Sequence, residues 1–97
     1  MVFIGIVWTK HAMERFLERA LLYGFSRTEI EEIIRKQKVR IDCGFDEKYK
    51  TKKFETIGII ANKFFTIEKA EDEKKIIVIT LWESNKKEAE LWLSKQK

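Results

Sequence analysis

The stretch FETIGIIANKFFTIEKAEDEKKIIVITLWE, residues 54–83, decides the fold of this chain. It contains three runs rich in Ile, Phe, Thr and Val, over residues 54–60, 64–69 and 76–83, and such runs predict β-strands. Only residues 61–63 and the polar residues 70–75 separate them. Two short connections in succession predict an antiparallel meander.

The third run has an unusual pattern, because residues 76–79 (IIVI) are apolar at every position. A strand with no polar face is typically buried on both sides of its sheet. We therefore expect helices to cover one face, and the last helix or another subunit to cover the other.

Two helices are expected before the meander. An apolar run over residues 3–8 predicts an opening strand, and Thr9 is a suitable N-cap for the helix that follows. At 100° per residue, Met13, Phe16, Leu17, Ala20, Leu21 and Tyr23 form one apolar arc. Gly24 is suited to ending this helix, and Ser26 with Glu29 forms a capping box for a second helix that should end near Gln37. The short connection predicts a helical hairpin.

A third short helix is expected at the other end of the chain. Asn85 and Glu88 have the spacing of a capping box, and a helix of this length needs a docking residue, for which we propose Trp92. The sequence thus predicts one α+β domain over residues 1–97. Its element order is β-α-α-β-β-β-α, with the helical hairpin packed on an antiparallel sheet.

Composition bounds the class of protein. The chain has 97 residues, of which 44% are hydrophobic, enough for one modest core. The single cysteine, Cys43, excludes an internal disulfide and suits a reducing compartment. The opening MVFIGIVW is too short for a membrane span and lacks the basic residues of a signal peptide. We expect a cytoplasmic protein with no membrane association.

Positive charge is concentrated in one connecting segment. Residues 35–53 have a local balance of +5, although the whole chain carries only +4. Within it, Lys48, Lys50, Lys52 and Lys53 surround Tyr49, so the lysines are candidates for phosphate contacts and the tyrosine for base stacking. The alternative is that these lysines keep an exposed strand edge from pairing with other chains.

The start of the first helix offers the best candidate for chemistry. His11 and Arg15 are neighbours at i and i+4, and Arg19 follows one turn later. A histidine can transfer protons and an arginine can hold a phosphate, two of the functions needed to cleave RNA through its own 2′-hydroxyl. Leu22 lies within this polar arc and predicts that the face is partly covered. The alternative is that His11 bonds a nearby carbonyl and Arg15 pairs with Glu18.

Glu83 and Cys43 are two further residues with side chains that could take part in catalysis. Glu83, which ends the last strand, is a candidate base if it faces the same cleft as His11, and otherwise an ordinary exposed carboxylate. Nothing in the sequence shows Cys43 to be an activated thiol. No cofactor is predicted, and no metal site, because metal-ligand spacings and a glycine-rich phosphate loop are missing from the sequence.

These motifs also carry a family resemblance. The T-x-H-A-x-x-R pattern of Thr9, His11, Ala12 and Arg15, the capped helix from Ser26, and the strand from Ile76 to Thr80 resemble a small family of proteins of unknown function. That family is distantly similar to BrnT-type ribonuclease toxins of the RelE-like superfamily. In those relatives a turn of the Arg-Gly-Ile type follows the first helix, whereas here the stretch after Arg19 is longer. The resemblance implies the fold and, more remotely, a toxin-like activity.

Two functions follow as hypotheses. The first is a toxin-like, RNA-directed protein of the metal-independent endoribonuclease type, with RNA or the ribosome and a small antitoxin as partners. The second is a non-catalytic protein-interaction or dimerisation module. The apolar third strand, Trp82, Trp92 and Leu93 predict a homodimer under either hypothesis.

Overall fold

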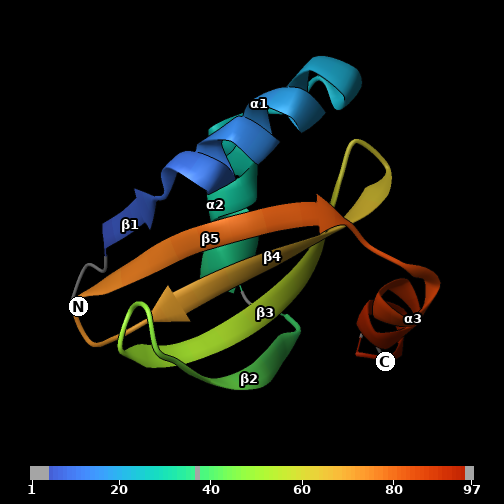
Figure 1. Ribbon diagram of the computed structural model, residues 1–97. Coiled ribbons are helices and arrows are strands. Elements are labelled where there is room, and N and C mark those ends of the chain that lie inside the picture. Colours follow the sequence, from blue (N-terminus) through green and yellow to red (C-terminus); the bar gives the residue numbers. More distant parts are fainter. Residues whose placement is uncertain (1–4, 37, 96–97) are drawn as a thin grey trace.

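The computed structural model describes residues 5–36 and 38–95 as an α+β fold. Figure 1 shows the elements in chain order: β1 (Gly5–Trp8), α1 (Lys10–Tyr23), α2 (Arg27–Lys36), β2 (Arg40–Asp46), β3 (Thr51–Ile60), β4 (Lys63–Glu71), β5 (Lys75–Glu83) and α3 (Lys86–Ser94). The predicted fold class is confirmed. The predicted meander is present as β3, β4 and β5.

The five strands form one mixed sheet in the order β1-β5-β4-β3-β2. The pairs β2–β3, β3–β4 and β4–β5 are antiparallel, whereas β1 lies parallel to β5 with Trp8 opposite Val78. Two parts of this sheet differ from the prediction. The expected connection before the meander contains a further strand, β2. The sheet is also not purely antiparallel, because β1 pairs with β5 in parallel.

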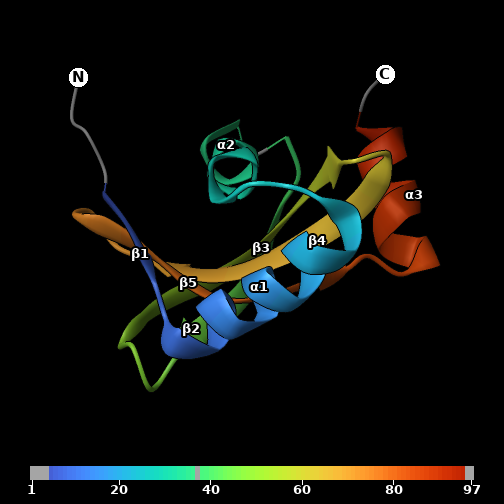
Figure 2. The ribbon, with the colours of Figure 1, turned by 90° about the horizontal axis from the view of Figure 1, so that it is seen from above.

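The two helices before β2 pack on different strands. Most contacts of α1 are with β5, and most contacts of α2 are with β3. Figure 2 shows α2 on one side of the sheet and α1 running along its edge, so the two helices do not lie side by side as the predicted hairpin would. The core forms beneath α2, from Ile30 and Ile34 of the helix and from Phe65, Ile67 and Val78 of the sheet.

The predicted caps are present and fix the helix boundaries. The Thr9 side chain accepts a hydrogen bond from the Ala12 amide, and Gly24 ends α1 with a left-handed φ of 69°. Ser26 and Glu29 bond each other's backbone groups at the start of α2, and Asn85 and Glu88 do the same at the start of α3. The expected end of α2 near Gln37 lies outside the described residues, as do residues 3–4 of the predicted opening strand.

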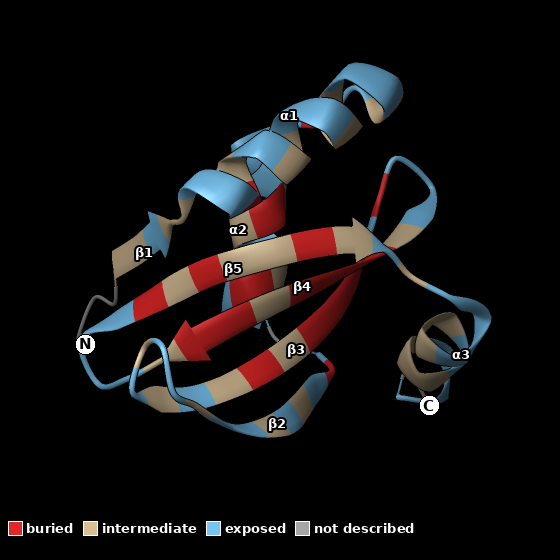
Figure 3. Cartoon of the chain, in the orientation of Figure 1, coloured by how far each residue is buried: buried red, intermediate tan, exposed pale blue. Residues whose placement is uncertain are grey.

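The all-apolar run in β5 is not covered equally on its two faces. Ile76 and Val78 are buried, while Ile77 and Ile79 are half-buried. Figure 3 shows this alternation along β5. The last helix does not lie over this run: α3 is placed beyond the far end of β5 (Figure 1), where its Trp92 ring lies 5.5 Å from that of Phe64 on β4.

The surface expected to form a dimer is mostly internal. Ile76, Val78 and Leu81 are buried within the single chain, and Trp82 is half-buried with its indole N–H donating to Glu88 of α3. In the rest of the predicted dimer surface, Trp92 is half-buried and Leu93 is 54% exposed, so the apolar surface left for a second copy lies on α3. Among the described residues, no helix is long and apolar enough to span a membrane.

Candidate functional site

Thr9 fixes the start of α1 against β5. Its backbone N–H donates to the Val78 carbonyl at 3.1 Å, and its hydroxyl donates to the Ile79 carbonyl at the same distance. Ala12, one turn into the helix, is fully buried. Because Ala12 faces the core, the exposed side chains of His11 and Glu14 point away from it.

The β2–β3 hairpin is held by its own acidic residues. Asp46 accepts a hydrogen bond from the Tyr49 amide at 2.9 Å, and Asp42 accepts one from the Gly44 amide at 2.8 Å. Gly44 has a φ of 87° and lies in a bulge where the pairing of β2 with β3 shifts register. A bulge bends the strand that contains it, and Figure 2 shows the hairpin tip bending toward the start of α1.

The hairpin tip and the start of α1 enclose an open hollow of about 540 Å³. Its walls are Thr9, Lys10, His11 and Glu14 from the start of α1, Lys48 and Tyr49 from the hairpin, and Ile79 from β5. The Lys48 ammonium lies 5.5 Å from the centre of the Tyr49 ring. Two segments that were predicted separately, the His11 helix and the basic connector, thus meet at one place.

Comparison with protein families, with curated proteins and with solved structures finds no match to this chain.

The hollow combines three kinds of chemical group. His11 and Glu14 can exchange protons, Lys10 and Lys48 are cations suited to phosphate oxygens, and Tyr49 offers an aromatic face. His11 and Glu14 are three residues apart on α1, so they share one side of the helix. Glu14 was not among the predicted site residues. Its spacing from His11 could have revealed it, but only the hairpin placement shows that both line a site.

Arg15 lies next to this hollow but is occupied. Its guanidinium donates to Glu18 at 3.2 Å, the alternative pairing considered from the sequence. Arg19 lies one turn further from the hollow, and its Nε atom is buried with no hydrogen-bond partner among the described residues. Neither arginine lines the hollow.

Glu83 is not brought to His11. Its carboxylate accepts a hydrogen bond from the Tyr23 hydroxyl at 3.4 Å and pairs with Lys63 at 3.5 Å. Tyr23 is the last residue of α1, twelve residues beyond His11, or about 18 Å along a helix. The structure therefore favours the alternative of an ordinary strand-end carboxylate.

The other predicted lysines spread over the hairpin. Lys50 lies at the exposed tip with a φ of 53°, Lys52 is exposed on β3 and lies 3.7 Å from Asp42, and Lys53 is half-buried. Successive residues of a strand point to opposite faces, so Lys52 and Lys53 cannot serve one continuous surface. Of the predicted nucleic-acid residues, only Lys48 and Tyr49 reach the hollow.

Two sequence-based inferences about reactivity have clear outcomes. Leu22, from which we expected the polar face of α1 to be partly covered, is itself 68% exposed, although Arg15 and Arg19 on that face are half-buried. Burial, with a contribution from the Glu55 carboxylate, raises the pKa of the Cys43 thiol to about 11. A thiol with this pKa is protonated at neutral pH, which agrees with an unreactive Cys43.

Proposed function

We propose that this chain is an RNA-directed protein of the metal-independent endoribonuclease type, acting in the cytoplasm. The observation that supports the proposal is the meeting of His11 with Lys48 and Tyr49 around one hollow. Proton transfer, phosphate neutralisation and base stacking are the three requirements for cleaving a single strand of RNA at a chosen phosphate. The remote likeness to BrnT-type toxins agrees with this class of activity.

The proposed reaction breaks the bond from phosphorus to the 5′-oxygen of the next nucleotide. Glu14 accepts the proton of the 2′-hydroxyl as its oxygen attacks the adjacent phosphorus, and the imidazolium of His11 gives a proton to the departing 5′-oxygen. The products are a 2′,3′-cyclic phosphate and a free 5′-hydroxyl. Lys10 and Lys48 neutralise the charge on the non-bridging oxygens.

Arg15 has a conditional place in this proposal. Its pair with Glu18 is on the surface, with the Arg15 side chain 43% exposed, and exposed pairs of this kind contribute only about 0–1 kcal/mol. A phosphate can therefore displace Glu18 at small cost. Arg15 is one helical turn from His11, close enough to support a bound phosphate there.

The test is cleavage of RNA by wild-type and variant protein. His11→Ala should lower the rate about 100-fold or more, the usual scale for removing a general acid or base. The wild type should cleave equally well in excess EDTA. Substrates should include free single-stranded RNA and translating ribosomes.

A matched control guards against loss of fold. Lys87→Ala changes an exposed polar residue in the first turn of α3 and should leave the rate unchanged. Thermal unfolding of each variant checks that it remains folded. A folded wild type, free of any inhibitory partner, that leaves both substrates intact would end the enzyme proposal.

A second candidate function is supported by a different observation. Leu17 and Leu21, one turn apart on α1, are 54% and 89% exposed. An exposed apolar strip on a helix is typical of a protein-docking surface, so a non-catalytic interaction module remains the alternative. A small antitoxin or a second copy of the chain are the partners we propose for it.

A further inference from the structure

One exposed aromatic residue in the basic hairpin has no role in the hollow. Phe45 lies on β2 directly after the Gly44 bulge, and 60% of its surface is exposed. A large apolar side chain exposed on an edge strand favours aggregation through that edge. Such a residue is therefore more often found where it binds a partner. Among the described residues of the hairpin, residues 40–53, it is the only large hydrophobic residue that is exposed.

The register of the hairpin places a cation beside this ring. Phe45 lies opposite Lys52 on β3, and side chains at directly opposed positions have Cβ atoms about 5 Å apart. An aromatic ring next to an ammonium group can hold one nucleotide through its base and its phosphate.

Two of the three acidic residues of the hairpin, Asp42 and Asp46, are engaged, while the third, Glu47, is exposed in the turn. Asp42 accepts from the Gly44 amide and lies 3.7 Å from Lys52, and Asp46 accepts from the Tyr49 amide. Lys48 and Lys50 make no ion pair among the described residues. The hairpin, residues 40–53, carries five basic residues against three acidic ones, so it keeps a net charge of +2, with Lys48 and Lys50 at its tip.

We propose that Phe45 is a base-stacking position for single-stranded nucleic acid, with Lys52 and the tip lysines contacting the adjacent phosphates. The strand would run from Phe45 over the hairpin tip to Tyr49 and the His11 hollow. This inference rests on the proposed function and adds a binding subsite to it. A protein partner is disfavoured here, because the surroundings of Phe45 are charged and the exposed apolar strip lies elsewhere, on α1.

The experiment measures binding of a labelled oligouridylate to full-length protein by fluorescence anisotropy over a range of salt concentrations. Phe45→Ala should weaken binding about 5- to 100-fold, the loss expected for one stacked base. The slope of affinity against salt should not change, because no phosphate contact is removed. Phe45→Tyr keeps the ring and should restore the affinity.

Two matched comparisons make the test specific. Leu22→Ala removes an equally exposed apolar side chain outside the hairpin and should have no effect on RNA binding. An abasic oligonucleotide offers phosphates without bases, so wild type and Phe45→Ala should bind it alike. Oligothymidylate should show the same Phe45 dependence as oligouridylate, because stacking does not require a 2′-hydroxyl.

The outcomes separate this inference from the proposed function. A wild type that binds no RNA overturns both. If the wild type binds but Phe45→Ala binds equally well, or loses affinity for the abasic strand to the same extent, only the stacking inference fails. A Phe45→Ala variant that changes sedimentation and not RNA affinity would assign the ring to a protein contact and also overturn it.

Discussion

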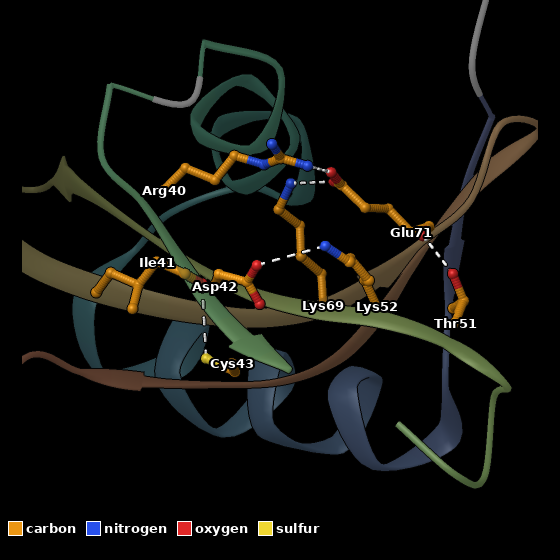
Figure 4. Close-up of polar contacts among 8 residues, drawn as sticks. All are labelled: Arg40, Ile41, Asp42, Cys43, Thr51, Lys52, Lys69 and Glu71. Atoms are coloured by element: carbon orange, nitrogen blue, oxygen red, sulfur yellow. Dashed lines mark hydrogen bonds and ion pairs between the residues drawn. The ribbon is translucent and has the colours of Figure 1, made fainter. Parts of the chain in front are cut away.

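At the scale of single residues, Glu71 of β4 contacts both strands of the β2–β3 hairpin. Its carboxylate bonds the Lys69 ammonium at 2.6 Å and pairs with the Arg40 guanidinium, while its backbone carbonyl accepts from the Thr51 hydroxyl. Figure 4 shows Arg40 and Lys69 converging on this carboxylate, with Cys43 pointing to the opposite side of the sheet. Thr51 begins β3 directly after the tip, so Glu71 links the hairpin to β4.

Glu71 also compensates the positive charge of Lys69, which is buried away from water. Lys69 is fully buried, and burial lowers the pKa of its ammonium, an effect that Glu71 opposes. Burial alone would raise the pKa of Glu71, but hydrogen bonds from Lys69 and Arg40 outweigh it and lower that pKa below its ordinary value of 4.5. The folded state is therefore stabilised by the ionised form of Glu71.

Glu71→Gln should lower the free energy of unfolding at pH 7 by about 3 kcal/mol, because it leaves the buried Lys69 charge uncompensated. A depressed carboxyl pKa stabilises fully above pH 4.5, and this contribution is lost as the pH falls through the lower folded-state value. The difference between wild type and variant, measured by urea unfolding, should therefore shrink below pH 4.5.

Adding Lys69→Met to Glu71→Gln should recover stability, and Glu73→Gln in the exposed turn should change little. A pH-independent difference would contradict this account.

Sequence reasoning was strongest at residues whose partners are close in the chain. The caps at Thr9, Gly24, Ser26 and Asn85 follow from spacings of at most three residues and were all predicted. The Arg40–Glu71 pair joins residues 31 apart and crosses β3, so it depends on a strand register that no local pattern encodes. The same limit hid Glu14 and Phe45, whose importance depends on where the hairpin lies.

At the scale of elements, the positions of the strands in the sequence could be predicted, but which strands pair in the sheet could not. The three strands of the meander follow from composition and short connections, but the pairing of β1 with β5 joins segments about 70 residues apart in sequence. Helix placement was also beyond local patterns. Of the expected apolar arc of α1, Phe16 and Tyr23 pack against the core, but Leu17 and Leu21 are exposed. Ala12, outside that arc, is fully buried.

The close packing of α2 on the sheet depends on Gly58 of β3. A Cβ atom at Gly58 would lie 2.5–2.7 Å from three side-chain carbons of Ile33, so any side chain there must displace Ile33 or the helix that carries it. Gly58→Ala should therefore lower the free energy of unfolding by about 1–3 kcal/mol, the usual cost of overpacking. Gly5→Ala is the control, because a Cβ atom there meets nothing within 4 Å. Combining Gly58→Ala with Ile33→Ala should show a favourable coupling in a double-mutant cycle. Equal stability of the two single glycine variants would refute close packing at this position.

At the scale of the whole molecule, charge and exposed apolar surface are separated. The basic hairpin and the His11 hollow lie at one end of α1, and Leu21 lies near the other end. Figure 3 shows that α1 is exposed along much of its outer side. A partner bound to the leucine strip would therefore sit beside the hollow without needing to enter it.

This separation allows self-association and RNA binding to be tested independently. We predict a dimer at micromolar concentration in sedimentation velocity, because Leu17 and Leu21 are large apolar residues that are 54% and 89% exposed. The double substitution Leu17→Ala and Leu21→Ala should give a monomer with unchanged RNA affinity. Leu93→Ala on α3, a residue equally exposed and named with the predicted dimer surface, should leave the dimer intact. A wild type that stays monomeric at high concentration would exclude the homodimer, and dissociation by Leu93→Ala alone would move the interface from α1 to α3.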